Sequence, residues 1–405
     1  MQKFEKHSPV VVTEVTTKHE LRQFMQYPNR LYADNPNYIP SFYGDDLSDW
    51  TPGKNPAFDY CEARCWLAWR DGEIVGRIGA ILSHKANDKF GTHRMRFSQV
   101  DFVDDSEVSA ALFGMVERWA REKGCDQVHG PLGFTDMDRE GMLVEGFDRR
   151  SLFFTNYNAP YYLEHLTRLG YRKDVDWIEY RITVPAPGST EAERLHKLSE
   201  FILKRKNLHV ATVHHKSEYG PFVRQVFELV NAAYAPLYGV VELSDEQIER
   251  YANKFIPLVD PDFVCFVLDE QDKLVAFGVT ALDPSVALKH SDGRLFPFGW
   301  AGVLNDLHHS DTLIMLLTAV RPDLQTEGIN AVMMDHVCQS CNRHGVQFAE
   351  TGPMLELNDH ILAQWKRLEK EQHKRRRCFI KDLNHDVNAA NTAAAAQAEA
   401  PETAP

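Results

Sequence analysis

The stretch that decides the fold is Leu316–Ala331, LLTAVRPDLQTEGINA. It begins with an apolar run typical of a buried strand, turns at Pro322, and leads into a predicted helix that ends at Gly345. A strand, a glycine-bearing loop and a helix N-terminus together present unpaired backbone N–H groups to an anion. Gly328 has no Cβ and would let a ligand approach the backbone closely. The stretch therefore predicts an anion-binding loop, and a plain turn is the alternative.

The composition restricts the class of protein. A chain of 405 residues is longer than one hydrophobic core requires, which predicts two domains. The 45 basic and 58 acidic residues give a net charge of −13, which disfavours nucleic acid or an anionic membrane as the main partner. Seven cysteines without framework spacing indicate a reducing compartment. Because neither a signal peptide nor a long apolar run is evident, we expect a cytoplasmic protein without a membrane span.

The predicted elements follow the same order in the two halves. Each half has an early strand and helices, an antiparallel set of strands, a helix, a strand, a further helix and a final strand. The helix at 106–124 has Ser106 as its expected N-cap, and the last helix is predicted at 359–372. We expect a first domain at 1–186, a connecting helix at 187–207, a second domain at 208–385 and a disordered tail at 386–405.

A weak internal repeat relates the halves. At an offset of 221 residues, Gly124 falls on Gly345. The strands that follow, DQVHGP and VQFAETGP, both end in Gly-Pro within one residue of register. Two copies with little sequence identity predict tandem domains rather than a solenoid.

This order of elements resembles the GNAT (GCN5-related N-acetyltransferase) superfamily over nearly all of residues 1–385. The resemblance implies an α/β (α+β) fold of two tandem domains, each a mixed central sheet flanked by helices. In that family, a loop of pattern Gln/Arg-x-x-Gly-x-Gly/Ala holds the pyrophosphate of acyl-coenzyme A. The matching residues here are Gln325, Gly328 and Asn330, so Asn replaces the last small residue. Glu327 is a second departure, because a carboxylate repels a pyrophosphate unless it points away.

The resemblance assigns the coenzyme to two adjoining segments. Backbone N–H groups of Thr318, Ala319 and Val320 would orient the acyl carbonyl. The pyrophosphate would lie on the loop formed by Gln325, Thr326, Glu327, Gly328, Ile329, Asn330 and Ala331. The implied co-substrate is acetyl-coenzyme A or another acyl-coenzyme A. No metal is expected, because Cys338 and Cys341 lack a second ligand pair.

Glu350 and Asn358 are the catalytic candidates. Glu350 shares strand parity with Val346 and Phe348, so its carboxylate could be covered and accept a proton from an amine. A salt-bridged or edge-exposed glutamate is the alternative. Asn358 matches the family asparagine near pantetheine and is equally suited as a helix N-cap. Trp365 stands where the family has a tyrosine that protonates the thiolate, and it has no phenolic proton.

The first half provides an internal comparison. The repeat places the loop Val103–Glu107, with three carboxylates and no glycine, where the second half has its anion-binding loop. We therefore expect the first half not to bind coenzyme and to serve as a structural partner or as a wall of the substrate site. The long loop Gly130–Arg150 could cover the acceptor. The aromatic residues Tyr234, Tyr238 and Trp300 could shape the acceptor pocket or pack in the core.

The resemblance predicts an acyl-coenzyme A-dependent N-acyltransferase with one coenzyme site, in the second domain. An unidentified amine, which could be a small molecule, would attack the thioester directly. Two further hypotheses stay open: an inactive ligand-binding or regulatory protein, suggested by Asn330 and Trp365, and a transferase that uses an aminoacyl or long-chain acyl donor. We expect a monomer or homodimer and no nucleic-acid partner.

Overall fold

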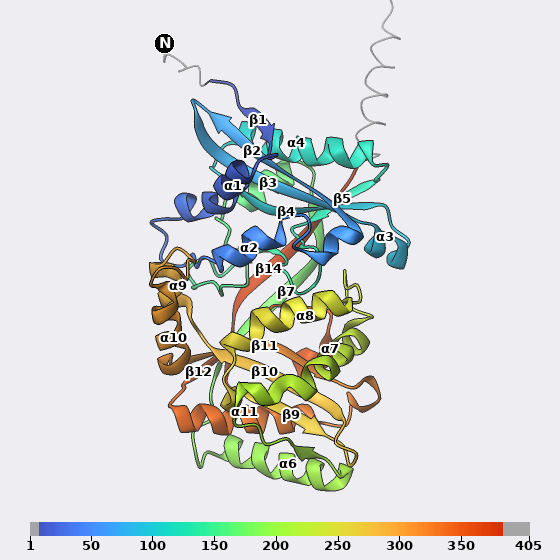
Figure 1. Cartoon of the computed structure of the whole chain (residues 1–405), viewed down its shortest axis with the longest axis vertical. Coiled ribbons are helices and arrows are strands. Elements are labelled where there is room, and N and C mark those ends of the chain that lie inside the picture. Colours follow the sequence, from blue (N-terminus) through green and yellow to red (C-terminus); the bar gives the residue numbers. More distant parts are fainter. Residues whose placement is uncertain (1–7, 384–405) are drawn as a thin grey trace, which may run out of the picture.

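Figure 1 shows the computed structural model, which describes residues 8–383. The tail predicted at 386–405 lies outside the described residues. The strands are β1 (Val11–Glu14), β2 (Cys61–Arg70), β3 (Glu73–Ser83), β4 (Arg94–Phe102), β5 (Gln127–Gly130), β6 (Met142–Glu145), β7 (Arg172–Thr183), β8 (His209–Val210), β9 (Val264–Leu268), β10 (Leu274–Leu282), β11 (Thr312–Val320), β12 (Phe348–Glu350), β13 (Met354–Leu355) and β14 (Lys370–Asp382). The helices are α1 (Lys18–Leu31), α2 (Tyr43–Asp49), α3 (His84–Phe90), α4 (Ser106–Glu122), α5 (Tyr162–Arg168), α6 (Thr190–Lys206), α7 (Gly220–Tyr234), α8 (Asp245–Phe255), α9 (Ser285–His290), α10 (Gly299–His309), α11 (Asn330–His344) and α12 (Asp359–Ala363).

The described strands form one sheet of 14 strands that runs through both halves. Its order is β1-β2-β3-β4-β5-β14-β7-β12-β11-β10-β9-β8, with β6 beside β14 and β13 beside β7. The pairs β4–β5 and β11–β12 are parallel and the others are antiparallel. The predicted class, a mixed sheet flanked by helices, is therefore confirmed.

The two closing strands are exchanged between the halves. The last strand, β14, pairs with β5 of the first half, and β7 pairs with β12 of the second half. The two strands also pair with each other along most of their length, and Figure 1 shows them crossing the middle of the molecule. We expected a separate sheet in each half, and this part of the prediction is wrong. The domain limits at 1–186 and 208–385 stay a prediction.

Buried charges lie where the exchanged strands meet. Lys374 and Arg376 of β14 and Glu179 of β7 have fully covered side chains. Arg376 Nε donates to Glu179 Oε1 at 2.5 Å, and Lys374 Nζ lies 3.4 Å from Glu179 Oε2. Because buried charges need partners, these pairs favour this register of β7 against β14 over a shifted one.

The predicted repeat is present as structure. In the first half α4 is followed by Gly124 and β5, and in the second half α11 is followed by Gly345 and β12. Both glycines have left-handed backbone, with φ of 73° and 71°. Such a residue ends a helix most readily when it has no Cβ, which explains why glycine stands at both positions.

Helices cover both faces of the second half of the sheet. Helices α7 and α8 bury one face with a cluster that includes Phe227, Tyr251 and Phe277. Helices α11 and α6 bury the opposite face with a cluster that includes Ile202 and Val332. The hairpin of α9 and α10, which the sequence pattern did not predict, packs beside Ile314 of β11.

Two local predictions are wrong. The helix expected at 359–372 is the short α12, and the chain has entered β14 by Lys370. The N-cap of α4 is Asp105 instead of Ser106, since the Asp105 carboxylate accepts from Glu107 N and Val108 N. Among residues 8–383, no helix is both long and apolar enough to cross a bilayer.

Candidate functional site

The second half contains an opening between two parallel strands. Pairing of β11 with β12 ends at Ile314 and Glu350, whereas β11 continues to Val320 paired with β10 on its other edge. The register between β10 and β11 shifts at Val279/Thr280, which leaves Leu316 as the extra residue of a bulge. Beyond Ile314, β11 therefore has one edge free of β12. Thr318, Ala319 and Val320, the predicted acyl-orienting residues, lie on this free section.

The predicted phosphate loop is an exposed turn at the N-terminus of α11. Residues 325–328 are exposed, and Ile329 is buried beneath them. Gly328 has a left-handed φ of 81°, which favours glycine. Helix α11 has no side-chain hydrogen bond at its N-cap. An anion at this position would meet the positive end of the α11 dipole without displacing a capping side chain.

Helix α6 explains why Glu327 is tolerated in the loop. Lys206 Nζ lies 2.7 Å from Glu327 Oε2, and this ion pair lowers the pKa of Glu327. The carboxylate is therefore directed toward α6 and its charge is offset. A Cβ at Gly328 would lie 3.1 Å from Ile202 Cδ1, so α6 also restricts this position to small residues. Sequence reasoning missed the role of α6, although the basic run Lys204–Lys206 marks it.

In the matching loop of the first half, the acidic side chains already have partners within the protein. Asp105 caps α4, and Arg70 pairs with Asp105 and Glu107 at 2.5 and 2.7 Å. His165 Nε2 lies 2.9 Å from Asp104 Oδ1. These carboxylates occupy the end of the helix where an external anion would have to bind. The structure thus gives a physical reason for the expected lack of coenzyme binding in this half.

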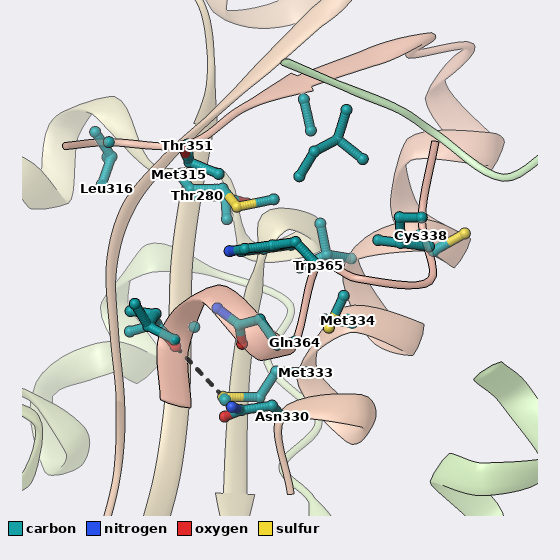
Figure 2. Close-up of a pocket in the computed structure, with 18 of the residues that line it drawn as sticks. Thr280, Met315, Leu316, Asn330, Met333, Met334, Cys338, Thr351, Gln364 and Trp365 are labelled. Atoms are coloured by element: carbon teal, nitrogen blue, oxygen red, sulfur yellow. Dashed lines mark hydrogen bonds between the residues drawn. The ribbon is translucent and has the colours of Figure 1, made fainter. Parts of the chain in front are cut away.

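A cavity of about 180 Å³ lies beside the opening, between β11, α11 and α12. Most of its wall is apolar. Its polar lining residues are Tyr234, Thr280, Thr318, Asn330, Thr351 and Gln364. Figure 2 shows the Trp365 indole across the middle of this first cavity, between Met315 of β11 and Met333 and Met334 of α11. Asn330, the departure from the family pattern, lines one end.

Trp365 is a packing residue of this first cavity. Its side chain is buried, and Nε1 lies 3.2 Å from Met354 Sδ. The indole fills space with carbon atoms and offers one N–H, which is already directed at sulfur. A proton for a departing thiolate must therefore come from another group or from water.

A second cavity, of about 80 Å³, lies on the other face of the sheet beneath α7 and α8. Its lining is apolar or aromatic throughout and includes Phe227, Ala252 and Phe266. Met137 from the first half completes the wall. Val279, Leu316 and Leu317 line both cavities, so the two spaces adjoin at the β11 bulge.

Of the three aromatic residues proposed for the acceptor pocket, Tyr234 lines the first cavity. Its hydroxyl donates to Thr318 O at 2.7 Å. Trp300 is exposed and donates to Pro297 O. Tyr238 lies elsewhere, in the segment after α7, where its hydroxyl contacts the exchanged strands at Asp174 of β7 and Cys378 of β14. The structure therefore brings one of the three to the free section of β11.

The Tyr238 hydroxyl joins His129, Asp174 and Cys378. It donates to Asp174 Oδ2 at 2.6 Å and lies 3.0 Å from His129 Nδ1 and 3.5 Å from Cys378 Sγ. The ligand atoms of the latter three residues lie within 4.8 Å of one another, which is loose metal-ligand spacing. Because the phenol hydrogen-bonds to all three, the group serves as a polar contact between the halves.

The two catalytic candidates have structural partners. Glu350 is buried at the end of the β11–β12 pairing, with Lys374 Nζ 3.2 Å from its Oε2. His373 Nε2 lies 3.8 Å from the same oxygen. The Asn358 side chain caps α12 by accepting from Ile361 N at 3.3 Å, and Asn358 does not line either cavity. Their catalytic roles stay a prediction.

The bulged strand, the opening beside it and the exposed loop before α11 define the fold class. No family model matches the sequence. The chain superposes on a tandem GNAT protein from the clavulanic acid biosynthesis pathway with a TM-score of 0.52. The match has 12% identity and covers 92% of this chain and 98% of that one. The chain has the tandem GNAT fold, and the resemblance is confirmed at the level of the fold.

Two relatives are similar in sequence over much of their length. The chain is 27% identical to protein YghO of Escherichia coli (strain K12) over 379 residues, which is 92% of this chain and 95% of that protein. It is 29% identical to bacterial ceramide synthase of Caulobacter vibrioides (strain NA1000 / CB15N) over 299 residues, which is 72% of this chain and 75% of that protein.

Proposed function

We propose that the chain is an N-acyltransferase that moves a long-chain acyl group from a coenzyme A thioester to a primary amine carrying its own hydrocarbon chain. The observation that carries this proposal is the meeting of two apolar cavities at the β11 bulge, near Leu316. Similarity to a bacterial ceramide synthase supports the same class, because a ceramide is the amide of a fatty acid and a long-chain amine.

The coenzyme would bind along the second half. Its pyrophosphate would lie on Gln325–Ala331, where the α11 N-terminus supplies positive charge and Lys206 offsets the charge of Glu327. The pantetheine arm would follow the first cavity toward Thr318, whose position on the free section of β11 leaves backbone groups available to the thioester. One coenzyme site is proposed, because the carboxylates of the first-half loop fill the corresponding position.

The part of the acyl chain next to the thioester would occupy the second cavity, whose volume of about 80 Å³ holds a few CH₂ groups. Burial of each CH₂ group contributes about 0.8 kcal/mol, which is about fourfold in affinity. A lining of carbon atoms, such as those of Val226, Phe227 and Leu317, offers no polar partner to a short hydrophilic group. The second cavity therefore favours a long acyl chain over acetyl. The same apolar lining disfavours an aminoacyl donor, because the ammonium group of that donor would lack a polar partner in the second cavity.

The reaction would be direct attack of the amine on the thioester carbonyl. Backbone N–H groups between Thr318 and Val320 would hold the carbonyl oxygen as it gains charge. Glu350 remains a candidate proton acceptor, although its carboxylate already pairs with Lys374.

The test is amide formation with donors and acceptors of two lengths. Hexadecanoyl-coenzyme A and acetyl-coenzyme A are each combined with a C18 2-amino alcohol or with ethanolamine, and products are measured by mass spectrometry. The long donor with the long amine is expected to give the largest kcat/KM, by at least about 100-fold over acetyl with ethanolamine, since several CH₂ groups are buried. Equal rates for all four pairs would contradict the proposal.

A pair of glycine variants tests the coenzyme loop. Gly328→Glu adds a carboxylate to the loop, and Gly188→Glu adds one at an exposed glycine of similar φ, 75° against 81°, outside it. Gly328→Glu is expected to weaken binding of hexadecanoyl-coenzyme A by at least about tenfold in calorimetry, whereas Gly188→Glu leaves it unchanged. Tight binding by the wild type without amide formation from any pair would instead favour a non-catalytic binding protein.

A further inference from the structure

We propose that the α9–α10 hairpin docks the protein on the surface of a zwitterionic lipid bilayer. The choice of lipid as the partner rests on the proposed function, because a donor and an acceptor with hydrocarbon chains partition into lipid. The docking element is the tip between the two helices, residues 295–300, with the sequence LFPFGW. Figure 1 shows α9 and α10 at the left edge of the molecule, where the two halves meet.

The hairpin gathers exposed apolar side chains. Twelve large apolar side chains are exposed among residues 8–383, and six of them lie within 286–304. Phe296 and Phe298 are the most exposed of the twelve, at 83% and 80%, and Trp300 is 48% exposed. Single exposed apolar residues are common on any protein, whereas such a concentration on one hairpin indicates an interaction surface.

Contacts with the first half hold the base of the hairpin in place. Tyr43 N donates to Gly293 O at 3.0 Å, and Asn29 Nδ2 donates to Asp292 O at 3.1 Å. A Cβ at Gly293 would collide with Ser41 O, so this turn is closely packed against the first half. The tip therefore projects from a base that is fixed to the rest of the protein.

The hairpin covers the same face of the sheet as the second cavity. Val279 and Ala281 alternate along β10 and therefore face the same side. Val279 lines the second cavity, and Ala281 packs in a cluster with Leu288 of α9 and Val303 of α10. Leu316, the bulge residue, packs against this cluster and also lines the second cavity. Docking at the tip would therefore bring the proposed acyl site close to the lipid that contains the substrates.

The charge of the hairpin suits a zwitterionic surface. Residues 285–309 carry two basic side chains, Lys289 and Arg294, and two acidic ones, Asp292 and Asp306, so their net charge is zero with histidine neutral. The whole chain has a net charge of −13, which an anionic bilayer would repel. A neutral, aromatic tip can enter the interface of an uncharged bilayer without that repulsion.

The indole of the tip already has a hydrogen-bond partner. Trp300 Nε1 donates to Pro297 O at 3.2 Å, and Trp300 N donates to Leu295 O at 2.9 Å. Entry into the bilayer interface therefore leaves both of these donors bonded, and the cost of removing water from them is small.

The area of the tip favours a bilayer over a second protein. The two phenyl rings and half of the indole expose on the order of 400 Å² of apolar surface. A stable protein partner buries about 800 Å² on each side, about twice as much. Binding to a bilayer has no such minimum, because its strength rises with the apolar area that enters the lipid.

Sedimentation with vesicles of dioleoylphosphatidylcholine measures the contact. Wild-type protein is expected to sediment with the vesicles. The double variant Phe296→Ser/Phe298→Ser should lose at least about tenfold in its lipid partition coefficient, since each buried CH₂ group contributes about fourfold. The matched control Phe201→Ser/Leu357→Ser changes two side chains outside the hairpin, 57% and 76% exposed, and should keep the wild-type coefficient. Both variants should keep the wild-type thermal midpoint.

A fluorescent label reports on the tip directly. All seven cysteines of the chain are buried, so an environment-sensitive thiol dye reacts selectively at the position changed in Phe296→Cys. The dye emission is expected to shift to the blue when vesicles are added. The same dye on Phe201→Cys, at the exposed side of α6, should show no shift.

Absence of vesicle binding, or equal binding by the wild type and the tip variant, would overturn the inference. So would self-association of the wild type that the tip variant loses, without a dye shift on vesicles, because a second copy would then cover the tip. Neither measurement needs a donor or turnover. If vesicle binding depends on the tip and no amide forms from any pair, the inference stands and the proposed function fails. Amide formation without vesicle binding would overturn the inference and leave the proposed function intact.

Discussion

Replacement of Lys374 by methionine is the perturbation that most directly tests how the exchanged strands are held together. Lys374 Nζ lies 3.2 Å from Glu350 Oε2 and 3.4 Å from Glu179 Oε2, and its side chain is fully covered. In Lys374→Met, Glu179 keeps Arg376 at 2.5 Å. Glu350 loses the cation that faces it.

The remaining neighbour cannot replace that charge. Burial, followed by the charge of Lys374, lowers the pKa of His373 to about 3. Burial is the larger cause and persists in the variant, so His373 stays neutral near pH 7. Removing one partner of a buried ion pair costs about 3–5 kcal/mol, a large part of a total stability of about 5–15 kcal/mol.

Urea denaturation at pH 8 and pH 5 measures this cost. Lys374→Met should lose about 3 kcal/mol or more at pH 8. The loss should shrink at pH 5, because a buried carboxylate without a partner escapes the penalty by binding a proton. The double variant Lys374→Met/Glu350→Gln should recover at least half of the loss, since the amide carries no charge. Lys197→Met removes an exposed pair and should change stability by less than about 0.5 kcal/mol.

A loss below about 1 kcal/mol in Lys374→Met would refute the reasoning, because the measured cost would then be that of an exposed pair. The same holds if the double variant is no more stable than the single one. Either result would mean that Glu350 does not depend on Lys374 as its partner.

Three further predictions concern the loops, the first cavity and pH. Asp105→Ala removes the N-cap of α4, so the free energy of unfolding measured in urea should fall by about 1 kcal/mol. Its affinity for hexadecanoyl-coenzyme A should be unchanged. Weaker binding would show that the first-half loop contacts the coenzyme. Trp365→Ala enlarges the first cavity, so the free energy of unfolding measured in urea should fall by about 3–5 kcal/mol. Trp365→Phe should lower it much less. Equal losses in the two variants would show that the ring is not packed. Burial by itself would raise the pKa of Glu179, but Arg376 and Lys374 lower it on balance, below the unfolded value of about 4.3. The stabilising effect of the Glu179 carboxylate is therefore present above about pH 4.3 and lost as pH falls through its folded pKa. In Glu179→Gln, the free energy of unfolding should fall less steeply with decreasing pH below about pH 4.3. An equally steep fall in the variant would contradict this.

Much of the fold could be predicted because its signals are local. Alternating and helical periodicity placed β11, α11 and the Gly345 stop, since these depend on neighbours a few residues away. The acidic loop Val103–Glu107 was recognised for the same reason, because its charge and its lack of glycine are properties of the sequence itself. Short helices such as α9 and α10 were missed, because tertiary contacts with Ile314 rather than their own pattern stabilise them.

The sequence by itself predicted the tandem order of elements and a loop, Gln325–Ala331, with the residues expected of an anion site. Tertiary structure alone decided what surrounds that loop. It turned Glu327 toward Lys206, gave Glu350 a buried partner and exchanged β7 with β14. Each of these contacts joins residues far apart in the chain, and packing between distant segments leaves no periodic trace in a single sequence.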